Sequence, residues 1–135
     1  MRIALLGDIG IFGRFAQMSD EQFTEYYREY LNIIHDCDFV VGNLEVPFSK
    51  ERKEFREKSA CIFSDEKDIF KLKSLQLTHV NLANNHTGDY GEEGYDLTID
   101  LLENLGIEYF GVANKQAFIE FGNSKIALSG YCNMD

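Results

Sequence analysis

Three short runs of apolar residues, each followed at once by small polar residues, most strongly limit the folds open to this chain. The runs do not alternate with polar residues, which is typical of strands buried on both faces of a parallel sheet. Because the carboxyl ends of parallel strands meet at one edge, the polar residues after the runs are expected to share one crevice. The runs and their polar ends are Ile3–Leu6 with Gly7-Asp8, Phe39–Val41 with Gly42–Glu45, and Leu77–Ala83 with Asn84–His86.

Helical segments are predicted between these strands. Ser19 followed by Gln22 forms a capping box, and apolar residues then recur at helical spacing to about His35. A second helix is expected to begin with Ser64 as its N-cap and to bury Phe70 among its apolar residues. A third, over residues 92–105, ends at Gly106. The predicted strands cover residues 2–7, 38–42, 77–83 and 107–110, and residues 117–121 and 125–130 flank a hairpin turn.

Strand–helix alternation at this spacing predicts an α/β fold with a mainly parallel sheet flanked by helices. The 135 residues are enough for one domain. Because few elements remain to cover a second face of the sheet, we expect residues 1–135 to be a single domain cut short on its C-terminal side. A complete small α/β unit is the alternative.

Composition excludes several classes of function. The net charge of −10 argues against nucleic-acid binding, which needs a basic surface. The sequence contains no apolar stretch long enough to span a membrane. The apolar run at the N-terminus is too short for a signal-peptide core, and the three cysteines lack a CxxC pair. These features together predict a cytoplasmic location.

The polar residues at the strand ends suit a divalent cation such as Mn²⁺, Mg²⁺ or Zn²⁺, which accepts carboxylate, amide and imidazole ligands. Each residue also has a simpler interpretation: Asp8 as a turn cap, Glu45 as a solvent-facing side chain, Asn84 as a left-handed turn residue and His86 as a buried histidine. Their joint occurrence at three strand ends favours a metal site. The predicted metal ligands are Asp8, Glu45, Asn85 and His86, with Asn43, Asn84 and Asp89 as further ligands or as residues behind them.

Two further stretches of the sequence indicate what kind of substrate or cofactor the chain could bind. Residues 50–58 carry a net positive charge, so a basic flap there could attract an anionic substrate, with Arg56 and Lys58 as the predicted contacts. A solvated helical face is the alternative. The glycines between Gly7 and Gly13 are spaced G-x-x-G-x-x-G, with Asp8 where a pyrophosphate would approach, which argues against dinucleotide binding.

Taken together, these motifs resemble the CapA capsule-synthesis family, which is grouped with the calcineurin-like metallophosphoesterases. The resemblance extends in order through nearly the whole chain, and its most specific part is the Asn-Asn-His-x-x-Asp-Tyr-Gly segment. The matching stretches are Leu5–Asp8, Val41–Glu45, Leu82–Gly91, Gly94–Thr98, Leu102–Ile107 and Gly111–Ala113.

The resemblance implies the N-terminal half of a four-layer αββα sandwich with a two-metal centre, in which Asp8 binds the first metal, Asn85 is a ligand and His86 lies near the phosphate. The next ligand would be either Glu45 or Asn43, the latter at the place of the usual bridging aspartate. Two departures are that Asp8-Ile9-Gly10 lacks the histidine of an Asp-x-His motif and that the family's later histidines would lie beyond Asp135.

The predicted function is metal-dependent hydrolysis of a phosphate ester, or a related step, in the synthesis of a bacterial capsule, poly-γ-glutamate or an exopolysaccharide. His86 and Asn85 are the predicted catalytic residues, and the substrate is a small molecule or polymer, expected to be anionic. We expect enzymatic activity of the full-length domain. The alternative is a non-catalytic module that binds an anionic polymer or a sugar in the same crevice.

Overall fold

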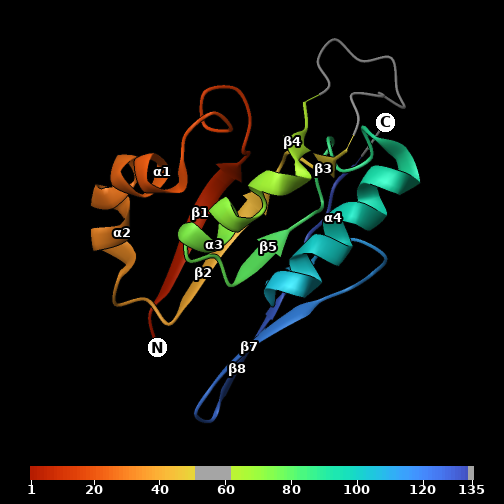
Figure 1. The fold of residues 1–135 in the computed structure, drawn as a ribbon. Coiled ribbons are helices and arrows are strands. Elements are labelled where there is room, and N and C mark those ends of the chain that lie inside the picture. The colour runs from red at the N-terminus through yellow and green to blue at the C-terminus, as the bar shows by residue number, and fades with distance from the viewer. Residues whose placement is uncertain (51–61, 134–135) are drawn as a thin grey trace.

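A four-stranded parallel sheet forms the centre of the protein (Figure 1). The structure, a computed structural model, describes residues 1–50 and 62–133. Within these residues the strand order is β1-β2-β5-β6, and every neighbouring pair is parallel. The predicted α/β class with a mainly parallel sheet is confirmed. The strands are β1 (Ile3–Ile9), β2 (Phe39–Leu44), β5 (His79–Asn81) and β6 (Glu108–Phe110).

The register of the sheet places three polar residues in one row across neighbouring strands. Asp8 pairs with Asn43, and Asn43 pairs with Asn81. The register shifts between Leu5, which pairs with Val41, and Asp8, and this shift brings Asp8 rather than Gly7 opposite Asn43. Partners in a parallel register point to the same face of a sheet. The row therefore collects Asp8, Asn43 and Asn81 near the carboxyl edge of the sheet.

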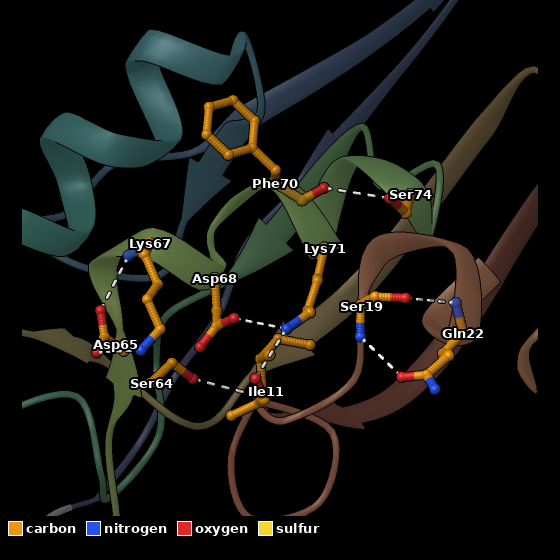
Figure 2. A network of polar contacts seen from close by, with 11 residues as sticks. Ile11, Ser19, Gln22, Ser64, Asp65, Lys67, Asp68, Phe70, Lys71 and Ser74 are labelled. Carbon is orange, nitrogen blue, oxygen red and sulfur yellow. Dashed lines mark hydrogen bonds and ion pairs between the residues drawn. The ribbon is translucent and has the colours of Figure 1, made fainter.

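Two short helices replace the single helix expected after Ser19. These are α1 (Asp20–Tyr26) and α2 (Arg28–Ile34), separated at Tyr27. The predicted capping box is present: Ser19 Oγ accepts a hydrogen bond from Gln22 N, and Gln22 Oε1 accepts one from Ser19 N (Figure 2). Phe23 and Ile34 are the buried residues of the pair, and they pack into the main core.

The segment around Ser64 differs from the prediction. Ser64 lies in the short strand β4 (Ser64–Asp65), which pairs in parallel with β3 (Phe48–Ser49). Asp65 caps the following 3-10 turn η1 (Glu66–Asp68) by accepting a hydrogen bond from Lys67 N (Figure 2). The helix α3 (Phe70–Ser74) begins only after that turn. Phe70, expected to be buried, is 61% exposed because the short helix turns it away from the sheet.

The C-terminal elements follow the prediction more closely. The helix α4 (Gly91–Leu105) ends at Gly106, whose φ of 69° is the left-handed conformation that glycine adopts most readily. Beyond β6, the strands β7 (Ala117–Phe121) and β8 (Ser124–Leu128) form the predicted antiparallel hairpin.

The sheet has different partners on its two faces. One face packs against residues of α1 to α4 in the larger core cluster, and the other packs against the hairpin through Val41, Phe110, Ala117 and Ile119. Cover on the hairpin side is incomplete, because Leu5 in β1 is 76% exposed. No helix in the described part of the chain is long and apolar enough to cross a membrane.

Candidate functional site

Asp8 is held at the end of β1 by the neighbouring strand. Its Oδ1 accepts a hydrogen bond of 2.7 Å from Asn43 Nδ2, which belongs to β2. The carboxylate lies within the row described above and borders a cavity of about 390 Å³ beside the sheet edge. A carboxylate that receives an amide donor on one oxygen keeps further lone pairs for a cation or a water molecule.

Asn43 joins the three strand ends. Its Oδ1 accepts hydrogen bonds from Asn81 Nδ2 at 2.9 Å and from Asn84 Nδ2 at 3.4 Å. Because the carboxylate of Asp8 only accepts hydrogen bonds, Asn43 must present its amide nitrogen there and its oxygen to the other two asparagines. In this arrangement Asn43 positions Asp8 and does not offer its oxygen to a cation.

Asn84 organises the turn that follows β5. It is buried, and its Nδ2 donates to the carbonyl oxygen of Leu44 at 2.9 Å. Its Oδ1 accepts from the backbone N–H groups of His86 and Thr87 at 3.0 and 3.1 Å, and from Thr87 Oγ1 at 3.2 Å. The amide therefore satisfies the backbone of the turn that carries His86, in agreement with the strong preference of asparagine for such turns.

His86 forms a short contact with a fully buried carboxylate. Its Nδ1 lies 2.7 Å from Asp89 Oδ2, and the Asp89 side chain is 0% exposed. The backbone N–H of Asp89 also donates to the carbonyl oxygen of His86. When Asp89 is ionised it accepts a hydrogen bond from Nδ1, which places the ring proton on that nitrogen and leaves the lone pair of the neutral imidazole on Nε2.

Glu45 reaches the same cavity from the end of β2. Its backbone N–H donates to the carbonyl oxygen of Ile9 at 3.1 Å, so the chain leaving β2 stays close to the end of β1. Glu45 and Asp8 both line the cavity. The structure therefore places these two predicted carboxylates on one concave surface.

Three other predicted site residues are Asn85, Arg56 and Lys58. Asn85 is exposed in the turn between Asn84 and His86. Arg56 and Lys58 fall outside the described residues, so their predicted substrate contacts stay predictions.

The donor set meets the needs of a divalent cation only in part. Asp8 and Glu45 supply carboxylate oxygens, and His86 and Asn85 are of the right chemical type. The amide oxygens of Asn43 and Asn84 are already occupied by hydrogen bonds. Among residues 1–50 and 62–133, no three His, Cys, Asp or Glu side chains gather closely enough to hold a metal ion. A cation held by Asp8 and Glu45 would therefore need further ligands, such as water, substrate oxygens or other residues.

Sequence reasoning missed Asn81, which donates to Asn43 and also bonds to the backbone of Ala83. Its surroundings are tight: a Cβ on Gly111 would lie 2.5 Å from Asn81 Oδ1, and one on Gly130 would lie 1.9 Å from it. A signal was present in the sequence, because Asn81 is a polar amide between the apolar residues Val80 and Leu82, just before the predicted strand ends.

Comparisons with known proteins agree with the motifs. The family model described as "Bacterial capsule synthesis protein PGA_cap" matches residues 2–135. A capsule biosynthesis protein CapA from Bacillus anthracis is 27% identical over 115 residues, which cover 82% of this chain and 28% of that protein. A PGA biosynthesis protein CapA from Bacillus subtilis is 27% identical over 112 residues, which cover 80% of this chain and 29% of that protein. The chain thus spans less than a third of the length of these curated relatives.

Proposed function

The chain belongs to the PGA_cap family of bacterial capsule synthesis proteins, and from this premise we propose that its strand-end site serves metal-dependent hydrolysis of a phosphate ester. The reaction, or a closely related step, would contribute to the synthesis of a capsule, poly-γ-glutamate or an exopolysaccharide. The relatives named for capsule and PGA biosynthesis motivate this biological setting. Mn²⁺, Mg²⁺ or Zn²⁺ would be held by Asp8, Glu45, Asn85 and His86.

The observation that supports the proposal most is the hydrogen-bonded connection between strand ends. Asn43 links Asp8 to Asn84, and Asn84 holds the backbone of the turn that carries His86. Such a connection keeps a carboxylate and an imidazole in fixed positions at one edge of the sheet. Preorganised side chains at the carboxyl ends of parallel strands are the usual setting for ligands in α/β proteins.

The chemistry divides among these residues. A bound divalent cation lowers the pKa of a coordinated water and neutralises charge on a phosphoryl oxygen. Asn43 keeps Asp8 oriented by donating to its Oδ1. Asp89 holds the His86 proton on Nδ1, so Nε2 has one of two roles. It would bind the cation as an unprotonated nitrogen or, when it is protonated and binds no metal, donate a hydrogen bond to the leaving-group oxygen as that atom gains negative charge.

The alternative, a non-catalytic module for an anionic polymer or a sugar, makes a different demand on the site. Among the described residues that line the cavity, none is Lys, Arg or His, whereas two are carboxylates. An anionic polymer would be repelled there unless a cation intervened. Polymer binding that persists in the presence of a chelator would therefore favour the module over the hydrolase.

The proposal is tested with the full-length protein. Hydrolysis of a phosphate monoester is measured with and without Mn²⁺ for the parent, for Asp8→Asn and for His86→Ala. Matched controls are Asp100→Asn, an exposed aspartate of α4, and His35→Ala, an exposed histidine. Turnover that depends on Mn²⁺ and falls at least about 100-fold in both site variants but in neither control supports the proposal. Equal turnover in site and control variants contradicts it.

A further inference from the structure

A preformed cavity lies beside the strand ends and extends away from them. Its volume is about 390 Å³, within the range of small-molecule sites. Asp8 and Glu45 contribute its carboxylates, and most of the other described lining is apolar or aromatic. Those lining residues are Leu6, Ile9, Gly10, Ile11, Phe12, Phe15, Tyr27, Tyr30, Val46, Ile62 and Leu75.

The loop that supplies Phe12 and Phe15 is fixed on both sides of Phe12. Ile11 N donates a buried hydrogen bond of 3.1 Å to Ser64 Oγ (Figure 2). The carbonyl oxygen of Ala16 accepts one of 3.1 Å from Lys71 Nζ. Because Ser64 in β4 and Lys71 in α3 hold the loop through these hydrogen bonds, this wall of the cavity does not need a ligand to form.

The second of these anchors is itself held by a buried ion pair. Lys71 Nζ lies 2.5 Å from Asp68 Oδ1, and both side chains are almost fully buried (Figure 2). A buried ammonium group keeps its position when it is paired and hydrogen-bonded. Lys71 satisfies both conditions through Asp68 and Ala16, so the end of the loop is tied firmly to α3.

The lining next to Phe15 presents further aromatic rings, those of Tyr27 and Tyr30. Tyr27 lies with its ring centroid 6.0 Å from that of Phe15 and 6.1 Å from that of Tyr30. Tyr30 donates its hydroxyl proton to the carbonyl oxygen of Leu75, and burial raises the pKa of this phenol to about 12. The tyrosine therefore stays neutral, and this wall offers an uncharged surface suited to ring stacking.

These features divide the cavity into a charged end and an apolar interior. We propose that the interior holds an uncharged, ring-bearing part of the phosphate ester, while the phosphoryl group lies at the Asp8–Glu45 end. This inference rests on the proposed function, because it assumes a cation between the carboxylates and the phosphoryl group. An anionic group would gain nothing by entering the interior, whose described lining has no cationic side chain. A ring would displace water from apolar walls at no electrostatic cost.

The test compares two phosphonates that differ only in the ring and cannot be hydrolysed. Binding of phenylphosphonate and of methylphosphonate to the full-length protein is measured by calorimetry in the presence of Mn²⁺. The variant is Phe12→Ala, in which a half-exposed ring of the cavity wall is removed. The matched control is Phe121→Ala on β7, because the two phenylalanines are 43% and 44% exposed and only Phe12 lines the cavity.

The inference predicts that phenylphosphonate binds roughly fivefold or more tightly than methylphosphonate. Phe12→Ala should remove most of this difference without changing the affinity for methylphosphonate, and Phe121→Ala should leave the difference intact. Equal affinities in the parent protein, or a preference that survives Phe12→Ala, would overturn it.

A second measurement separates the inference from the proposed function. Para-cresol carries a ring without a phosphoryl group and needs no cation. Binding of both phosphonates could fail because the cation site is absent, and that result would count against the proposed function. Shifts in the NMR signals of Phe12 and Tyr27 on titration with para-cresol would then still support ring binding in the cavity. No shift of these signals would overturn the inference.

Discussion

Asn43 Nδ2 and Asp8 Oδ1 lie 2.7 Å apart, and this hydrogen bond connects the ends of the two strands that begin the sheet. The same amide accepts hydrogen bonds from Asn81 and Asn84 through its oxygen. One side chain therefore forms hydrogen bonds with the side chains of three other residues, Asp8, Asn81 and Asn84. A site built on such a shared partner should be sensitive to its removal, because three hydrogen bonds are lost together.

Replacing Asn43 by alanine tests this sensitivity. The change removes the partner of Asp8, Asn81 and Asn84 together, so we expect the free energy of unfolding to fall by about 1–3 kcal/mol. We also expect Mn²⁺ affinity to fall, since Asp8 loses its fixed orientation. Urea denaturation and calorimetry measure the two effects. The control is Asn32→Ala, an exposed asparagine of α2; equal effects of the two variants would show that Asn43 has no special role.

The Asp89→Asn substitution tests whether the carboxylate charge of Asp89, and not only a polar side chain of the same size, is needed to orient the His86 imidazole. An asparagine keeps the size of the side chain but removes the negative charge that holds the proton on His86 Nδ1. We predict a loss of turnover of about 10–100-fold, in the range found when the carboxylate partner of a functional histidine is changed. The pH profile of turnover should also shift. Asp96→Asn, at an exposed position of α4, is the control. An unchanged rate and profile would mean that Asp89 is only a packing residue.

His79 should make stability depend on pH. It is buried at the start of β5, and burial lowers its pKa below the ordinary value of 6.5, more strongly than nearby Glu108 raises it. The unfolded chain then binds a proton more readily than the folded one, so this contribution to stability is complete above pH 6.5 and is lost as pH falls through the lowered pKa. Comparing urea midpoints at pH 8 and pH 5 should show a smaller decrease in His79→Gln than in the parent.

The exposed His35 provides the control for that experiment, because His35→Gln should retain the pH dependence of the parent. An identical decrease in the parent and in His79→Gln would show that His79 does not contribute. Carboxylates that titrate near pH 5 affect all three proteins alike. The contribution of His79 is therefore the difference between the proteins in how far the urea midpoint falls from pH 8 to pH 5.

Gly111→Ala tests the tight packing around Asn81. Gly111 has a φ of +90°, and a Cβ there would lie 2.5 Å from Asn81 Oδ1. We predict a loss of about 1–3 kcal/mol from backbone strain, together with weaker Mn²⁺ binding because Asn81 must move away from Asn43. Gly122→Ala is the control, since its φ is +59° but its Cβ would meet no atom within 4 Å. A loss of Mn²⁺ affinity that is equal in both variants would contradict the link to Asn81.

The sequence was sufficient to predict the order of the four central strands, the helix α4 and the C-terminal hairpin, because the apolar periodicity and the cap residues are local signals, but it did not predict β3 and β4. The capping box at Ser19, the left-handed Gly106 and the hairpin between β7 and β8 illustrate this. The break between α1 and α2 at Tyr27 could not be predicted, since the helical spacing of apolar residues continues across it.

Ser64 shows why the prediction of a helix beginning at this residue was wrong. A serine followed by acidic residues is a normal helix start, yet here its hydroxyl accepts a hydrogen bond from Ile11, which is 53 positions away. Likewise, the sequence showed that polar residues follow the strands, but it did not show which of them would face a ligand and which would hold the others in place. Which amide oxygen is occupied by another asparagine depends on the register of β1, β2 and β5, and that register is a tertiary property.

The most direct test of the proposed centre is anomalous diffraction from crystals of the full-length protein grown with Mn²⁺. We predict a manganese peak within about 2.0–2.6 Å of carboxylate oxygens of both Asp8 and Glu45, with His86 or Asn85 completing the contacts from this part of the chain. Full-length crystals with no manganese at these carboxylates, or with manganese bound only elsewhere, would contradict the account.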